Sequence, residues 1–439
     1  MKIPKRIAQV IINALNGGVV PRIGLPYITV GRKAEIDAML HDVDVIADGG
    51  AAFRFLIGKY GSGKSFLLQT MRSYCMDRNF VVIDADLSPE RRLHGNKGQG
   101  LATYRELIRN MSTKTRPDGG SLSLILDRWI QSVQTEVAAE GKYEVTSQAF
   151  SAEVEKRIYT VVQTLDEMVH GFDFAKLLTT YFHSVRNDDA DTKASVLKWF
   201  RGEYQNKTEA KNALGINLCI TDDDWYDYLK LFAVFLKRAG YSGMLVLIDE
   251  LVNVYKIPNS ITRQYNYEKI LTMYNDVLQG KASHIGFIMC TTPQCMEDKH
   301  RGVFSYEALR SRLQSGRFSL QTNVKDLLGP MIYLEPLTNE EMLILVEKLR
   351  DIHAELYDYP VRLQQQDLIH FIQIEYSRIG AQTNITPREV IRDFIELLNL
   401  LLQDSNITIE MILRSTDFSF AKPALQEDSD GSPFAEFEV

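Results

Sequence analysis

Residues 58–65 constrain the fold of this chain more than any other segment, because they follow directly on an apolar run. They read G-K-Y-G-S-G-K-S, and residues 53–57 before them have the composition of a buried strand. The glycines allow a tight turn that aims backbone N–H groups at an anion without an obstructing side chain. A helix expected from Ser65 to about residue 73 adds the positive end of its dipole. Strand, glycine-rich turn and helix in this order predict a phosphate-binding loop.

Two side chains of this loop have predicted chemical roles. Lys64 can neutralise the β- and γ-phosphates of a nucleotide, and the Ser65 hydroxyl can coordinate Mg²⁺. The alternative is a chance glycine-rich turn with a solvated lysine, which explains neither the full pattern nor the strand before it. We therefore expect ATP or ADP with Mg²⁺, bound by Gly58, Lys59, Tyr60, Gly61, Ser62, Gly63, Lys64, Ser65 and Phe66.

Length and composition indicate an ordinary globular protein. A chain of 439 residues predicts two or three domains, and 45% hydrophobic with 24% charged residues is a typical composition. No apolar run approaches the roughly 20 residues that span a bilayer. The N-terminal pattern is broken by Gln9 and predicts an amphipathic helix, not a signal peptide. The four cysteines lack metal spacing and are too few for a disulfide framework, so we expect a reducing, cytoplasmic setting. Because no apolar run is long enough to span a bilayer, we expect no membrane partner.

The charge balance limits how this chain can contact DNA. Its formal net charge of −7 argues against coating DNA by charge alone, so a contact needs a local basic patch. One candidate is the group Arg91, Arg92, His94 and Lys97, although a solvated loop is at least an equal alternative. The three tryptophans lie in helical patterns and are expected in the core: Trp129, Trp199 and Trp225.

Short buried strands alternate with helical patterns along the chain. The expected strands are residues 53–57, 80–84, 244–248, 285–290 and 331–334. This alternation predicts an α/β fold with a parallel sheet flanked by helices. The expected parts are an N-terminal helix and entry loop, an α/β domain with a helical insertion, a C-terminal helical domain and an acidic tail: 1–27, 28–336 (insertion about 87–240), 337–420 and 421–439.

Polar residues follow two of these strands and indicate a metal–nucleotide site. Asp249 would hold Mg²⁺ through its water shell, and Glu250 would orient and deprotonate the attacking water. After the next strand, Thr291 or Thr292 can sit beside the γ-phosphate, or can simply hold a strand-end turn. After a phosphate loop in the same chain, an apolar strand ending in Asp-Glu becomes a strong indication of nucleotide hydrolysis.

Three arginines complete the candidate set. Arg310 and Arg312 lie near a helix end; one of them can reach the γ-phosphate of a neighbouring subunit, or both can be surface charge. Pro387 suits the first turn of a C-terminal helix, and Arg388 beside it can reach the nucleotide or be solvated.

Together these motifs resemble the AAA+ ATPases, within them the initiator-type branch that includes archaeal origin-recognition proteins. The resemblance implies that Val30, Gly31 and Arg32 border the adenine. It also implies that Lys64 and Ser65 belong to the Walker A motif, and that Asp249 and Glu250 belong to the Walker B motif. Thr291 or Thr292 would be sensor 1, and Arg388 would be sensor 2. The arginine finger would be Arg312 or Arg310. The helical insertion departs from the general AAA+ plan.

A closer likeness is to the ATP-binding D protein of bacteriophage-exclusion (BREX) systems. The entry Val20-Pro21, Gly24-Leu25 and 30–32 precedes the phosphate loop here, and residues 88–104 resemble a stretch of that family. The likeness implies an ATPase of antiphage defence that forms homo-oligomers and works beside a helicase or nuclease. We expect a motor, loader or switch acting on DNA. The alternatives are a nucleotide-gated scaffold that assembles partner proteins without touching DNA, and a general replication-initiator-like loader.

Overall fold

The computed structural model describes residues 3–163, 165, 168–314, 326–377, 386–404 and 406–413. The predicted acidic tail, 421–439, lies outside these residues. Contacts divide the chain into two compact units. The first unit comprises Met1–Arg32, Lys59–Gln69 and Leu334–Val439, and the second comprises Lys33–Gly58 and Thr70–Tyr333.

The second unit is built on a parallel sheet of five strands in the order β2-β3-β4-β1-β5. The strands are β1 (Ala51–Ile57), β2 (Val81–Asp86), β3 (Met244–Asp249), β4 (Ile285–Thr291) and β5 (Met331–Tyr333). Because parallel strands run the same way, their carboxyl ends meet at one edge of the sheet. The predicted α/β class of a P-loop NTPase with helical domains is therefore confirmed.

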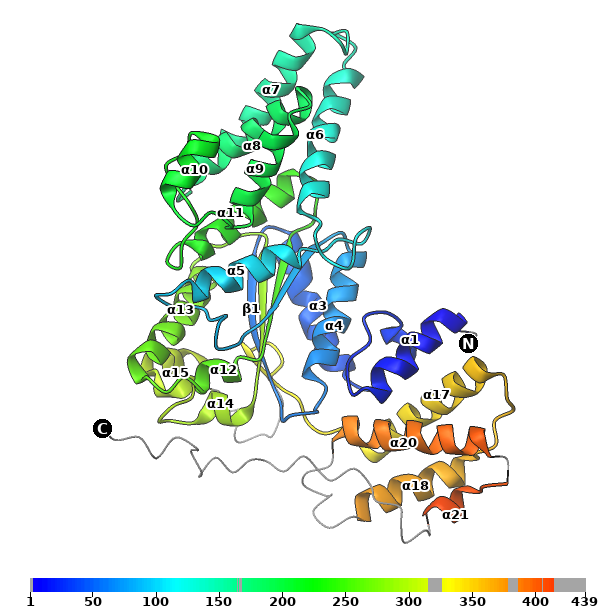
Figure 1. Cartoon of the computed structure of the whole chain (residues 1–439). Coiled ribbons are helices and arrows are strands. Elements are labelled where there is room, and N and C mark those ends of the chain that lie inside the picture. The colour runs from blue at the N-terminus through cyan, green and yellow to red at the C-terminus, as the bar shows by residue number, and fades with distance from the viewer. Residues whose placement is uncertain are drawn as a thin grey trace. The chain divides into compact units, whose positions relative to one another are not determined.

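Helices cover both faces of this sheet. Along β1 the Phe53 ring meets Tyr274 of α13 (Ser260–Leu278) edge-on at 5.5 Å, while Arg54 forms an ion pair with Asp42 of α3 (Lys33–Ala47) at 2.6 Å. Consecutive residues of a strand point to opposite faces, so α3 and α13 lie on opposite sides (Figure 1). The connections around the sheet contain α12 (Val252–Tyr255), α14 (Pro293–Glu297), the 3₁₀ turn η1 (Val303–Ser305) and α15 (Glu307–Leu313).

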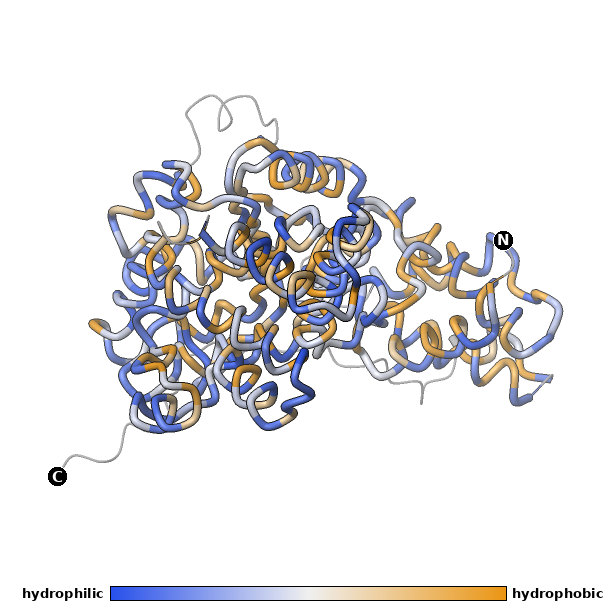
Figure 2. The backbone as a smooth tube through the Cα atoms, turned by 90° about the horizontal axis from the view of Figure 1, so that it is seen from above, coloured by the Kyte–Doolittle hydropathy of each residue, from blue (hydrophilic) through white to orange (hydrophobic). Residues whose placement is uncertain are grey.

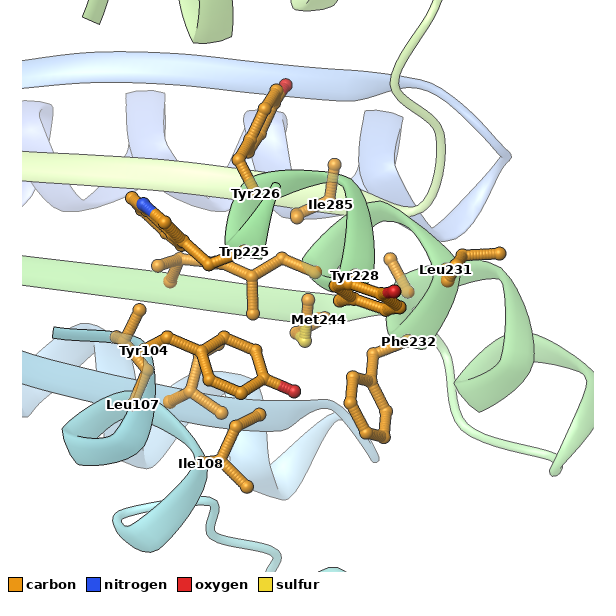
Figure 3. Close-up of a cluster of buried hydrophobic side chains, with 14 of the residues drawn as sticks. Tyr104, Leu107, Ile108, Trp225, Tyr226, Tyr228, Leu231, Phe232, Met244 and Ile285 are labelled. Atoms are coloured by element: carbon orange, nitrogen blue, oxygen red, sulfur yellow. The ribbon is translucent and has the colours of Figure 1, made fainter. Parts of the chain in front are cut away.

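The helical insertion packs against the beginnings of the central strands. Tyr104 of α5 (Gln99–Arg109) and Trp225 of α11 (Trp225–Arg238) belong to one buried cluster with Met244 and Ile285, the first residues of β3 and β4 (Figure 3). The insertion begins at the carboxyl ends of the strands, where the Leu87 N–H donates to the Asp249 carbonyl at 3.1 Å, and its helices after α5 lie toward the amino ends (Figure 1). Its helices are α5 (Gln99–Arg109), α6 (Leu122–Ala139), α7 (Gln148–Gln163), α8 (Gly171–Arg186), α9 (Ala190–Phe200), α10 (Lys207–Leu214) and α11 (Trp225–Arg238).

Aromatic rings fill the interior of the insertion. Trp129 meets Phe235 edge-on at 5.0 Å, and Trp199 meets Tyr228 in the same way at 5.3 Å. Both tryptophans are at most 2% exposed, and Trp225 is fully buried. The prediction that all three tryptophans are core residues is confirmed, and burial of such large rings contributes strongly to packing.

The first unit has its own core, in which α1 (Lys5–Asn16) packs on α17 (Asn339–Tyr357) and α20 (Pro387–Gln403). The prediction treated the N-terminal helix as a separate segment; it packs here because Ile11, Ile12 and Leu15 need an apolar partner. Figure 2 shows apolar and polar residues recurring in turn along the helices, as one buried face requires. The remaining helices of the unit are α2 (Leu25–Ile28), α18 (Gln365–Ser377) and α21 (Ile409–Leu413).

The predicted strands all exist, and each boundary differs by at most two residues. The helix after the phosphate loop, α4 (Lys64–Asp77), begins one residue before Ser65 and is longer than expected. Sequence patterns missed the long helix α13 and the shorter helices α2, α10, α12, α14 and α21. Helix α13 lacks a clear apolar stripe because its buried face also holds Arg263, Asn266 and Asp276.

Candidate functional site

The predicted phosphate loop belongs to the first unit from Lys59 onward. Gly61 and Gly63 have φ values of +74° and +93°, a backbone conformation that favours glycine. The Lys64 ammonium donates a hydrogen bond to the Lys59 carbonyl at 2.8 Å and lies 5.5 Å from the centroid of the Tyr60 ring. The ammonium therefore lies across its own loop, where phosphate oxygens would compete for it.

Arg32 forms hydrogen bonds both to this loop and to the segment that precedes α17. Its Nη2 atom donates to the Ser62 carbonyl at 3.2 Å and to the Glu335 carbonyl at 2.6 Å. Arg32 itself has a φ of +61°, which is uncommon for a residue with a side chain. Val30, also expected near the base, packs against the apolar core of the first unit.

The first turns of two C-terminal helices, α17 and α20, lie against Gly31 and Gly61, respectively. A Cβ placed on Gly31 would lie 2.3 Å from Glu341 Oε1, and one on Gly61 would lie 2.6 Å from Thr386 Oγ1. Glu341 completes a capping box with Thr338 at the start of α17. Thr386 caps α20 in the same manner, and Arg388 lies exposed in the first turn of that helix.

The two predicted acids lie at the end of β3 in the second unit. Asp249 Oδ1 accepts a hydrogen bond from the Glu250 N–H at 2.7 Å, and Glu250 has a φ of +57° with an exposed side chain. The register pairs Asp249 with Asp86 at the end of β2. Burial, and the charges of Asp249, Asp84 and Glu250, raise the pKa of Asp86.

Asp86 is the acidic neighbour that sequence reasoning missed. Its signal was present, since β2 ends in D-A-D, but only strand pairing shows which acid lies beside Asp249. Asp84 is instead paired with the buried Arg72 at 3.3 Å.

The two candidate threonines differ in their surroundings. Thr291 ends β4 beside Ile57 of β1, and its carbonyl accepts from the Gly58 N–H at 3.1 Å. Its hydroxyl is buried without a geometrically acceptable hydrogen-bond partner among the described residues. Thr292 caps α14, because its hydroxyl accepts from the Cys295 N–H at 3.2 Å. Thr292 thus holds the turn after β4, which was the alternative to a nucleotide contact. Thr291 is therefore the better candidate for a polar contact with a nucleotide.

The two candidate finger arginines share the short helix α15. Arg310 is half-buried and lies 3.7 Å from Glu307, one turn earlier in that helix. Arg312 is exposed, and its Nη1 donates to the Ala308 carbonyl at 2.7 Å. Exposure leaves the Arg312 guanidinium accessible to a neighbouring molecule.

The basic group after β2 lies along α13. Arg91 Nε donates to the Asp86 carbonyl at 2.9 Å, and the His94 ring stands 5.2 Å from Tyr265. The amide oxygen of Asn266 accepts from two backbone N–H groups of this loop, at 2.9 and 3.0 Å. Tyr265 is 50% exposed, so the His94 ring lies against an accessible aromatic ring.

The side chains that could hold a divalent cation include the Asp249 carboxylate. Within the described ranges, no group of three or more His, Cys, Asp or Glu side chains is arranged to hold a metal ion. Mg²⁺ is usually held by one or two carboxylates together with phosphate oxygens and water, and the Asp249 carboxylate is a donor of that kind. Among the same residues, no helix is both long and apolar enough to cross a membrane.

The predicted site residues divide between the two units. Residues 30–32, the loop from Lys59 and Arg388 belong to the first unit, whereas Asp249, Glu250, both threonines and both finger candidates belong to the second.

Residues 3–417 match the model of a protein family described as BREX system ATP-binding protein BrxC/D. No curated protein matches the sequence.

Proposed function

This chain belongs to the BREX system ATP-binding protein BrxC/D family, and we propose that it hydrolyses ATP with Mg²⁺ as well as binding it. Family membership assigns ATP binding in phage defence. The further step to hydrolysis rests on the residues at the strand ends.

The observation that carries this proposal is the register of the central strands. Strand β4 lies between β3 and β1, so Asp249 and Thr291 end neighbouring strands, and β1 beside them runs into the phosphate loop through Gly58. Ligands of open parallel sheets bind at the carboxyl ends of the strands. The strands that carry the metal-binding and water-positioning candidates thus end beside the strand that leads into the phosphate loop, and this strand order supports nucleotide hydrolysis.

In the proposed reaction, Glu250 accepts a proton from the water that attacks the γ-phosphorus, while the bond from that phosphorus to the β–γ bridging oxygen breaks and ADP leaves. Lys64 neutralises charge on the phosphates, and Thr291 orients the water or a γ-oxygen. Bound Mg²⁺, held through Ser65 and Asp249, would neutralise the developing phosphate charge. An arginine of a neighbouring subunit, Arg312 in preference to Arg310, would stabilise the transition state, and Arg388 would contact the nucleotide from its own chain.

We further propose that turnover is coupled to DNA, so that the protein acts as a motor, loader or switch. The basic loop that contains Arg91, His94 and Lys97 supports this, since its His94 ring lies against the exposed Tyr265 and an accessible ring near basic residues suits a nucleic-acid strand. The competing proposal is a nucleotide-gated scaffold for a helicase or nuclease, which the net charge of −7 favours.

The test is steady-state ATP hydrolysis, with and without duplex or single-stranded DNA, at low and high salt. Glu250→Gln serves as the blank, and Lys64→Ala should abolish nucleotide binding. Stimulation by DNA that weakens with salt would support a DNA-coupled ATPase with phosphate contacts. Turnover indifferent to DNA would favour the scaffold, and absence of turnover in the wild type would reject the ATPase proposal.

A further inference from the structure

Arg32 binds main-chain atoms from two distant parts of the first unit. One nitrogen, Nη2, donates to the carbonyl of Ser62 in the phosphate loop and to that of Glu335, three residues before the cap of α17. Both acceptors are backbone carbonyls, so the contact restrains the course of the chain and does not depend on the rotamer of an acceptor side chain. Hydrogen bonds from a charged donor are stronger than neutral ones.

The segment that carries Arg32 is itself held by the C-terminal helices. Lys348 of α17 donates to the Thr29 carbonyl at 2.7 Å. Gly31 lies so close to Glu341 that any side chain there would collide with the carboxylate. Gly31 and Arg32 have φ values of +63° and +61°, and two successive left-handed residues persist only where surrounding contacts hold them.

We propose that Arg32 is a positioning residue of the phosphate loop, which it holds in register with the segment entering α17. This inference rests on the proposed nucleotide function of that loop. Binding phosphates requires the N–H groups of the loop to keep one geometry, and Arg32 restrains the peptide that follows Ser62 directly. The Arg32 guanidinium thus joins the loop to the segment that enters α17, in addition to the direct contact of Thr386 with Gly61.

The first experiment measures ATP and ADP affinity with a fluorescent nucleotide analogue in Arg32→Lys and Arg32→Gln. A lysine keeps the charge but lacks the planar guanidinium of arginine, so both variants should lose about tenfold or more in affinity, with Gln the weaker. Arg22→Gln is the matched control, since Arg22 is an exposed arginine of the same unit. Wild-type affinity in Arg32→Gln would overturn the proposal.

Thermal unfolding separates positioning from a general structural role. A positioning residue should leave the melting temperature without nucleotide near that of Arg22→Gln and reduce the rise produced by ATP. An equal loss of stability with and without ATP, at unchanged affinity, would show a merely structural contact. If the wild type binds no nucleotide, the proposed function fails; if the wild type binds and the Arg32 variants bind equally tightly, the inference alone fails.

A second pair of variants tests the same device without changing the arginine. Gly31→Ala places a Cβ against Glu341 and should displace Arg32, again lowering ATP affinity. Removing the obstructing carboxylate in Gly31→Ala/Glu341→Ala should restore part of the loss, because the collision is gone and only the backbone strain at φ +63° and the lost capping box of α17 remain. Full affinity in Gly31→Ala would contradict the proposal.

Discussion

Thr386, the cap of α20, lies directly against Gly61 of the phosphate loop. A Cβ on Gly61 would be 2.6 Å from both Cβ and Oγ1 of Thr386. The hydroxyl also donates to Glu389 Oε2 at 3.0 Å, so the capping box holds the threonine in place. The glycine is therefore required twice, by its φ of +74° and by the close approach of the helix cap.

Replacing Gly61 by alanine should destabilise the protein by more than backbone strain alone. Overpacking costs about 1–3 kcal/mol, and a left-handed backbone adds roughly 1–2 kcal/mol. Gly141→Ala is the matched control, because Gly141 has a φ of +65° with nothing within 4 Å of its added Cβ. Urea unfolding of both variants measures the difference, and equal losses would show that Thr386 yields without cost.

Glu250→Gln should keep ATP affinity and lose turnover by roughly 10²–10⁴-fold, because the amide cannot accept the proton of the attacking water. Rapid-quench single-turnover hydrolysis gives the chemical rate directly. Glu268→Gln, on the exposed side of α13, should hydrolyse ATP like the wild type. A normal rate in Glu250→Gln would remove this residue as the general base.

Arg312→Ala should slow hydrolysis by about 10³-fold or more if its guanidinium acts on a neighbouring subunit. Mixing it with Lys64→Ala subunits should restore activity, because a Lys64→Ala subunit still offers its own Arg312 to the partner site. The half-buried Arg310 supplies the comparison through Arg310→Ala. Rescue confined to Arg310→Ala mixtures would transfer the role to that residue, and rescue in neither would argue against a shared site.

Acidification should weaken the first unit through His353. This fully buried imidazole lies 2.9 Å from the Tyr359 hydroxyl and 3.1 Å from Asn399 Oδ1. Burial lowers its pKa below the usual 6.5, partly offset by the hydrogen bond to Asn399. The unfolded chain then binds more protons than the folded one below about pH 6.5, so stability falls as pH drops through that value.

Urea midpoints at about pH 7.5 and about pH 5.5 measure this effect. His353→Gln should show a smaller change between the two pH values than the wild type, although it is less stable at both. His41→Gln, at an exposed position, should retain the full wild-type change. An unaltered pH dependence in His353→Gln would exclude this histidine as the source.

Local requirements are what the sequence by itself determined. The glycines of 58–65 encode left-handed turns, the apolar runs encode buried strands, and Thr338 with Glu341 encodes a helix start. Each requirement is met by residues a few positions apart, so the pattern is sufficient to predict the α/β class, the phosphate loop and the strand that ends at Asp249.

Pairings between distant residues were decided only by the tertiary structure. The register that sets Asp86 beside Asp249, the two carbonyls bound by Arg32 and the packing of α1 on α17 join segments that no local pattern relates. Helix α13 was not predicted from the sequence because polar side chains interrupt its buried face. Those side chains have partners in distant segments; Asn266, for example, accepts a hydrogen bond from the loop after β2. Such contacts depend on the free energy of the whole packed unit, whereas a turn or cap depends on its own few residues.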